Sequence, residues 1–147
     1  ITVDPHTTYA LKELYPKYTG ETFEVTPYFT RLRISEPRHK NGQPPVAIHD
    51  PCFYGRYLKL SEGPRQVLRS LGLEYVEVRN CGEFTSCCGG PAESVSPALN
   101  REILGRRVAE LKARGAPVVT MCPICLANLL KAGLPVEDLA SLVARFC

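Results

Sequence analysis

Short apolar runs alternate with amphipathic stretches along most of this sequence. The runs VAIH, LEYVEV and APVVTM are typical of buried strands, because they are short, apolar and bounded by turn residues. Between them apolar residues recur at helical spacing, as at Leu104, Val108 and Leu111. The pattern predicts strands over residues 46–49, 73–78 and 116–121, and helices over residues 61–71, 96–114, 123–132 and 136–146. This alternation predicts an α/β fold with a mainly parallel sheet.

The composition is that of one globular domain. Hydrophobic residues make up 44% of the 147 residues and charged residues 22%, which is enough to build a core and too apolar for a disordered chain. The net charge of +3 is too small and too dispersed to indicate a nucleic-acid partner. The densest basic stretch, residues 31–40, is interpreted as a solvated loop. No apolar run has the length of a membrane span, and no signal peptide is visible.

Cysteine is the unusual component of the chain, with seven residues. Two of them, Cys81 and Cys147, stand alone. The other five follow predicted strands: Cys52, Cys87, Cys88, Cys122 and Cys125. The carboxyl ends of parallel strands meet at one edge of a sheet, where ligands bind. We therefore expect three cysteine loops to converge at one sheet edge, which favours metal or redox chemistry over a disulfide framework.

The surroundings of these cysteines suit a thiolate-bound metal. A helix that begins at Pro123 directs free backbone N–H groups toward Cys122, and its positive end favours an anionic centre. Gly89 and Gly90 allow backbone amides to approach a sulfur closely. A lone CPIC segment is also typical of zinc ribbons and thioredoxin-like sites. The complete spacing is more specific: Cys52, 34 intervening residues, the Cys87 pair, 33 more residues, and then CPIC.

The stretches HDPCFYGRY, FTSCCGGPAES and VVTMCPICLANL resemble the cysteine-rich CCG domain of heterodisulfide reductase B/D-like iron–sulfur proteins. That family includes the iron–sulfur subunits of anaerobic glycerol-3-phosphate dehydrogenase and of glycolate and lactate oxidases. The resemblance implies that the five motif cysteines bind a 4Fe–4S cluster, which is of a noncubane type in heterodisulfide reductases. Zinc is the less favoured alternative, because some family members hold zinc at one such site. Cys81 and Cys147 match no motif position.

The first residues resemble the CPIC region. TVDPHTTYALK from Thr2 aligns with TMCPICLANLL, with Asp4 and Thr7 where Cys122 and Cys125 stand. Family members often carry two CCG repeats, so residues 1–44 are interpreted as the end of a degenerate first repeat plus a linker, and residues 45–147 as the CCG domain. A helix is expected to start at Pro5, with Asp4 or Thr7 as its cap, and to stop at Pro16. Coincidence in a short strand–helix junction is the alternative.

Three functions stay open from the sequence. The resemblance favours an electron-transfer subunit between a flavoprotein partner and a quinone or another acceptor, in the cytoplasm or on the cytoplasmic face of a membrane. Other iron–sulfur subunits, the first CCG repeat and a membrane anchor subunit are its expected partners. The alternatives are catalytic disulfide reduction at a noncubane cluster and a module stapled by zinc. The roles of His6, His49, Asp50 and Arg56 stay open between function and structure.

Overall fold

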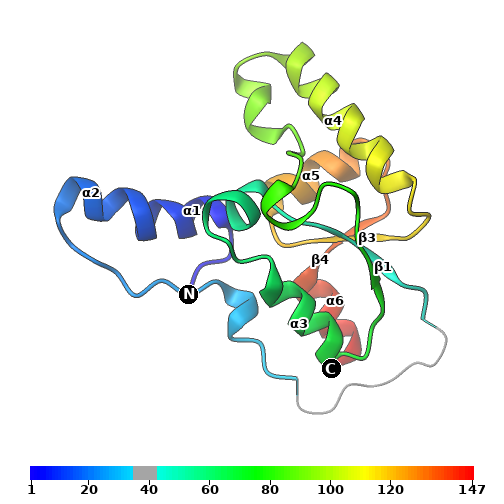
Figure 1. The fold of residues 1–147 in the computed structure, drawn as a ribbon, viewed down its shortest axis with the longest axis horizontal. Helices are drawn as coiled ribbons and strands as arrows, with labels where there is room; N and C mark the ends of the chain where they lie inside the picture. Colours follow the sequence, from blue (N-terminus) through cyan, green and yellow to red (C-terminus); the bar gives the residue numbers. More distant parts are fainter. Residues whose placement is uncertain (35–42) are drawn as a thin grey trace.

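A four-stranded parallel sheet forms the centre of the fold in the computed structural model, which describes residues 1–34 and 43–147 (Figure 1). Its strands are β1 (Val46–His49), β2 (Tyr75–Val76), β3 (Val118–Thr120) and β4 (Val136–Asp138). Their order is β2-β1-β3-β4, and every neighbouring pair is parallel. The predicted α/β fold with a parallel sheet is therefore confirmed.

Strand β1 lies between β2 and β3, and the chain visits these two neighbours on opposite sides of β1 in turn. It passes first to β2 and then crosses back to β3, whose Thr120 pairs with His49. All four residues of β1 and all three of β3 are buried, which explains why both read as continuous apolar runs. The crevice between the carboxyl ends of β1 and β3 is a topological switch point, where α/β proteins bind their ligands.

Helices cover both faces of the sheet (Figure 1). On one face α3 (Glu62–Ser70) and α6 (Leu139–Phe146) pack with Ile48 and Val119 in one hydrophobic core. On the other face α4 (Pro97–Lys112) and α5 (Pro123–Lys131) pack against Ala47 and Val118 in a second core. Alternate side chains of each strand therefore serve opposite layers.

Two predicted elements of the sheet domain differ from the structure. The apolar run over residues 73–78 forms a strand only at Tyr75–Val76, at the edge of the sheet. The helix predicted over residues 136–146 is wrong in its first turn, because Val136–Asp138 pairs with β3 as the edge strand β4. The helix α6 begins only after Asp138, whose carboxylate accepts a hydrogen bond from the backbone N–H of Ala140 at 2.8 Å.

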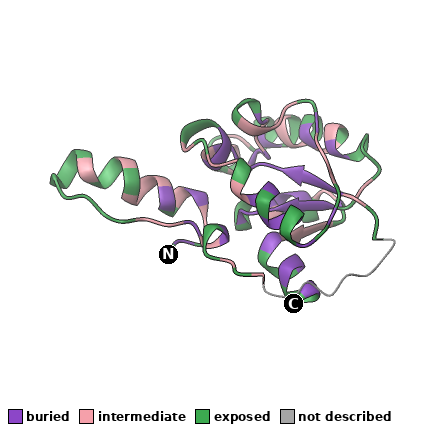
Figure 2. Ribbon diagram, turned by 60° about the horizontal axis from the view of Figure 1, so that its bottom comes forward, coloured by how far each residue is buried: buried purple, intermediate pink, exposed green. Residues whose placement is uncertain are grey.

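The N-terminal segment is a helical rod that projects from the sheet domain (Figures 1 and 2). It consists of α1 (Pro5–Tyr9), a π-helical turn η1 (Ala10–Leu14) and α2 (Tyr15–Thr19). The expected start at Pro5 and the cap by Asp4 are confirmed. The expected stop at Pro16 is wrong. Pro16 lies in the first turn of α2, where its missing N–H costs little, so the helical path continues to Thr19.

Shorter elements connect these parts. The 3-10 turn η2 (Tyr28–Thr30) follows an isolated parallel bridge between Thr2 and Pro27, which ties the first residues to the segment that leaves the rod. The solvated loop predicted over residues 31–40 lies mostly outside the described residues. The division at residues 44 and 45 stays a prediction. In the described parts of the chain, no helix has the length and apolar character needed to cross a membrane.

Candidate metal centre

The five motif cysteines come together at one edge of the sheet, and we call this group the cysteine centre. The sulfurs of Cys52 and Cys87 are 4.0 Å apart. Cys88, Cys122 and Cys125 form a separate buried cluster. Side-chain contacts from Cys87 to Cys88, from Cys88 to Cys125 and from Cys125 to Cys122 complete a continuous chain of five thiols. The predicted convergence of three loops is therefore confirmed.

The sheet topology places two of these loops at the switch point. Cys52 follows β1 and begins the π-helical turn η3 (Phe53–Tyr57). Cys122 follows β3 and is the N-cap of α5, with Cys125 in the first turn of that helix. Because β1 and β3 are neighbouring parallel strands, both loops leave the sheet side by side.

The third loop carries Cys87 and Cys88 between the 3-10 turns η4 (Gly82–Phe84) and η5 (Gly90–Ser94). Gly89 has a φ of +85°, a conformation that costs other residues energy. A β-carbon on Gly90 would lie 2.3 Å from Cγ2 of Ile124 in α5, so only glycine fits there without a shift. The Asn128 side chain also donates to the backbone carbonyl of Cys88 at 3.2 Å. The glycine pair therefore lets this loop approach α5 closely.

Backbone N–H groups point at three of the sulfurs. The N–H of Gly89 donates to Cys87 Sγ at 3.3 Å, and the N–H of Gly90 lies against Cys88. The N–H groups of residues 124 and 125, at the start of α5, donate to Cys122. These groups are the free donors of a turn and of a helix N-terminus, and they favour sulfur in its negatively charged form.

The thiols have unequal proton affinities. Hydrogen bonds from Cys52 and then Cys88 lower the pKa of Cys87 to about 2, and a hydrogen bond from Cys125, helped by backbone N–H groups, lowers the pKa of Cys122. Cys52 and Cys125 are the donors in these hydrogen bonds, so the contact with Cys87 raises the pKa of Cys52 and the contact with Cys122 raises the pKa of Cys125. The contact with Cys125 lowers the pKa of Cys88, but its contact with Cys87 and its burial outweigh this and raise that pKa to about 12. These shifts favour the thiolate form at Cys87 and Cys122 over the other three, and metal binding at all five would release protons.

The N-terminal rod closes one side of the cysteine centre. Pro5 and His6 line a small cavity together with four of the cysteines, all but Cys87. The His6 ring lies 4.4 Å from the ring of Phe53, and Tyr9 and Tyr57 extend this aromatic cluster outward. Deeper in, Thr8 is hydrogen-bonded to the hydroxyl of Tyr54 at 3.2 Å. His6 is therefore part of the cover of the site, a role that its sequence context did not reveal.

The start of the rod repeats the geometry of α5 without sulfur. Asp4 Oδ1 accepts hydrogen bonds from the backbone N–H groups of His6 and Thr7, each at 2.9 Å. Cys122 accepts from the two equivalent backbone positions of α5. These bonds lower the pKa of Asp4 against the opposing effect of its partial burial. A carboxylate cap therefore stands where the CPIC segment has the sulfur of Cys122.

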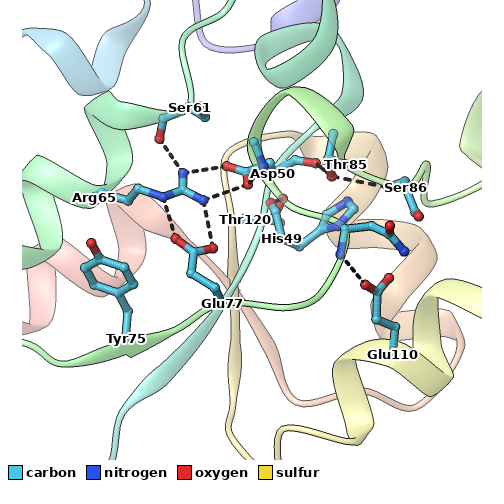
Figure 3. Close-up of polar contacts among 12 residues, drawn as sticks. His49, Asp50, Ser61, Arg65, Tyr75, Glu77, Thr85, Ser86, Glu110 and Thr120 are labelled. Carbon is cyan, nitrogen blue, oxygen red and sulfur yellow. Dashed lines mark hydrogen bonds and ion pairs between the residues drawn. The ribbon is translucent and has the colours of Figure 1, made fainter.

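Asp50 organises the base of the site (Figure 3). Its two carboxylate oxygens accept hydrogen bonds from the Arg65 guanidinium at 2.9 and 2.8 Å, and Arg65 also binds Glu77. The backbone N–H of Gly82 donates to Asp50 Oδ2 at 2.7 Å, and the Thr85 hydroxyl donates to the Asp50 carbonyl at 2.8 Å. Asp50 thus joins β1 to α3 and to the Cys87 loop, which is a structural role.

His49 is fully buried beneath the cysteines. Its Nδ1 accepts a hydrogen bond from Arg107 Nε at 2.9 Å, while its Nε2 has no hydrogen-bond partner among the described residues. A ring nitrogen of His49 and the sulfurs of Cys88 and Cys125 all lie within 4.8 Å of one another. Burial first, and then the charge of Arg107, hold the His49 pKa well below its ordinary value. The His49 imidazole is therefore neutral.

Other residues have clear places. Arg56 is exposed and lies near Cys52, where its positive charge lowers the thiol pKa against the stronger opposing effects of Cys87 and burial. Cys81 is half-buried and Cys147 exposed, and neither belongs to the cysteine centre.

Sequence reasoning missed Arg107, which lies on the buried face of α4 with no exposed surface. The sequence signal for a buried arginine would have been its position on the same helix face as the apolar Leu111, next to Val108.

Comparison with known proteins identifies the region that holds the centre. The family model for the cysteine-rich domain CCG matches residues 46–130, which include all five cysteines. A probable membrane-anchored ferredoxin of Chromohalobacter salexigens is 34% identical over 98% of this chain and 24% of its own length. A subunit of the dihydromethanophenazine:CoB–CoM heterodisulfide reductase of Methanosarcina acetivorans is 37% identical over 68% of this chain and 27% of its own length. An EtfAB:quinone oxidoreductase of Syntrophomonas wolfei is 30% identical over 86% of this chain and 20% of its own length. The chain thus spans about a quarter of the length of these relatives.

Proposed function

Because this chain belongs to the family of cysteine-rich CCG domains, we propose that its cysteine centre binds an iron–sulfur cluster and transfers electrons within an oxidoreductase complex. The observation that carries this proposal is the continuous chain of five thiols at the switch point of the sheet. Relatives named as a ferredoxin, a heterodisulfide reductase subunit and a quinone oxidoreductase support the same class of chemistry.

The donor set of the site fits such a cluster. Soft thiolate ligands select zinc, copper(I) or iron–sulfur clusters, and a structural zinc ion uses four of them. Five sulfurs exceed that number, which favours a cluster of several irons. The backbone N–H groups of Gly89, Gly90 and the α5 N-terminus would donate to sulfurs of the centre, and such bonds adjust cluster potential. We propose a 4Fe–4S cluster of the noncubane type on Cys52, Cys87, Cys88, Cys122 and Cys125.

The bound cluster would supply reversible one-electron chemistry, and the chain's own residues hold and shield it. The buried sulfurs of Cys88, Cys122 and Cys125 lie inside, and His6 and Phe53 cover one side. Cys87 is half-buried, and the charge of the exposed Arg56 acts on its thiol, so electrons would enter or leave at this side. The partners we propose are a flavoprotein, other iron–sulfur subunits with a further CCG repeat, and a quinone or membrane anchor subunit at the cytoplasmic face.

Catalytic reduction of a disulfide is the second candidate. Its support is the half-buried Cys87 sulfur within the field of the exposed Arg56 guanidinium, where an anionic disulfide substrate would find a positive charge. Such a reaction takes two electrons and two protons to give two thiols. A reduced dye donor and a disulfide acceptor, assayed with the complete complex, separate this activity from simple electron transfer.

Anaerobic reconstitution with iron and sulfide tests the proposal. The wild-type chain should develop broad visible absorbance with about equal iron and sulfide, and serine substitution of any of the five cysteines should change that signal. Cys81→Ser and Cys147→Ser are matched controls and should leave it unchanged. Stoichiometric zinc with no uptake of iron would refute the cluster. A native signal after the loss of one of the five would favour a cubane with four ligands.

A further inference from the structure

The contact between His49 and Arg107 fixes the tautomer of the buried imidazole. The Nε of an arginine carries a proton and can only donate, so the atom that it faces must accept. That atom is Nδ1 of His49, at 2.9 Å. An imidazole that accepts at Nδ1 is neutral and carries its proton on Nε2. The tautomer therefore follows from hydrogen-bond geometry alone.

Arg107 cannot easily release this hold. Its side chain has no exposed surface, and its Nη1 donates to the Asn80 carbonyl at 2.9 Å and to Glu110 at 2.8 Å. The backbone of His49 is fixed as well, because its carbonyl accepts from the Thr120 hydroxyl at 3.1 Å. Both partners of the Arg107–His49 bond are thus held from several sides.

The remaining proton of the ring, on Nε2, has no acceptor among the described residues. Nε2 is buried, and a buried N–H without an acceptor is costly. A ring nitrogen of His49 lies within 4.8 Å of the sulfurs of Cys88 and Cys125, so a sulfur of the cysteine centre is the acceptor that this ring has close by. Both sulfurs belong to the set that would bind the cluster.

We propose that His49 donates its Nε2–H to a sulfur of the cysteine centre and that Arg107 is the positioning residue that holds the donating tautomer. This inference rests on the proposed iron–sulfur cluster. The same geometry argues against His49 as a metal ligand, although a histidine near two cysteines suggests one. A ligand nitrogen must present its lone pair, and on Nε2 the proton occupies that direction.

The donated bond should raise the reduction potential of the centre. A hydrogen bond to a sulfur is stronger when the cluster is reduced, because the reduced cluster carries more negative charge. His49→Leu removes the donor, whereas His49→Gln places an amide N–H near the position of Nε2. We expect His49→Leu to shift the one-electron equilibrium about tenfold toward the oxidised form, a fall of about 59 mV. His49→Gln should keep most of the wild-type potential.

Two measurements test the inference separately from the cluster itself. In the metal-free chain, long-range 1H–15N correlation spectra of the histidines should show a proton on Nε2 of His49, and a proton on Nδ1 would overturn the proposal whether or not iron binds. In reconstituted protein, redox titration followed by EPR should give the difference between His49→Leu and His49→Gln. Equal potentials in both variants and wild type, or strong coupling of a labelled His49 nitrogen to the cluster spin, would also overturn it. A wild-type chain that binds no iron would refute the proposed function instead.

Discussion

Asp50→Asn should destabilise this protein far more than Glu77→Gln, although both carboxylates bind the same guanidinium. Asp50 is 1% exposed and Glu77 is 37% exposed in its side chain. Asparagine keeps one acceptor oxygen but turns an amide N–H₂ toward the two donors that meet Oδ2, from Arg65 and Gly82. The perturbation therefore removes a buried charge and leaves buried donors without acceptors.

The size of the effect follows from the hydrogen bonds that the substitution removes. Two hydrogen bonds to a charged oxygen contribute about 1.5–3 kcal/mol each, and breaking a buried ion pair costs about 3–5 kcal/mol. Arg65 keeps its two bonds to Glu77, so the lower end applies, and we expect a loss of about 3 kcal/mol for Asp50→Asn. Glu77→Gln weakens a half-exposed pair and should cost less than about 1 kcal/mol.

Thermal and urea unfolding of the metal-free variants at pH 7 measures both losses. For a domain of this size we expect Asp50→Asn to lower the Tm by roughly 6–12 °C and Glu77→Gln by less than about 4 °C. Asp50→Asn should also loosen the Cys87 loop and reduce cluster retention. Equal losses for the two variants, or a loss below about 1 kcal/mol for Asp50→Asn, would refute the view that Asp50 anchors this loop.

Three further predictions concern other contacts. Gly90→Ala should lower the free energy of unfolding by about 1–3 kcal/mol, because the new β-carbon would meet Ile124. Adding Ile124→Ala should relieve that loss. Gly105→Ala is the control: open space surrounds Gly105 in its helix, so this change should be neutral or stabilising. In the metal-free chain, iodoacetamide at pH 6 should alkylate Cys87 first, because its lowered pKa keeps it a thiolate, and peptide mass mapping would contradict this if labelling were uniform. Asp4→Ala should cost about 1 kcal/mol at pH 7 in urea unfolding. Because the pKa of Asp4 is lowered in the folded protein, the stability difference between wild type and Asp4→Ala should be fully present at pH values above 3.8, the ordinary pKa. It should fade as the pH falls through the pKa of the folded state, and an unchanged difference at pH 2 would contradict the cap.

Most of the fold could be predicted because local patterns and tertiary structure agree. The runs at Val46–His49 and Val118–Thr120 read as buried parallel strands and are covered on both faces. The failures occur where a tertiary contact overrides the local pattern. Val136–Asp138 was predicted as helix because it adjoins an amphipathic helix, yet pairing with β3 makes it a strand. Pro16 failed as a stop because it lies in the first turn of α2, after the π-helical turn, where the missing N–H of proline costs little.

The cysteine centre could be predicted as a set but not in its detail. The spacing of the motif and the topology rule together locate five sulfurs at one sheet edge. The dependence of that site on Arg107 could not be predicted, because its contact with His49 joins residues 58 positions apart. The cover formed by His6 depends on the path of the N-terminal rod, which the local pattern of residues 5–19 does not specify.

The convergence of three loops also has a consequence for chain entropy. Intervals of 34 and 33 residues separate Cys52 from the Cys87 pair, and the pair from Cys122. A cluster that holds these points together acts as a cross-link on the unfolded chain, and closure of each loop would remove conformational freedom worth about 4 kcal/mol. Such a chain resists unfolding mainly while its cross-link is in place. Oxidative loss of the proposed cluster would then abolish electron transfer and also mark the protein for unfolding and proteolysis, which would couple its lifetime in the cell to the state of that cluster.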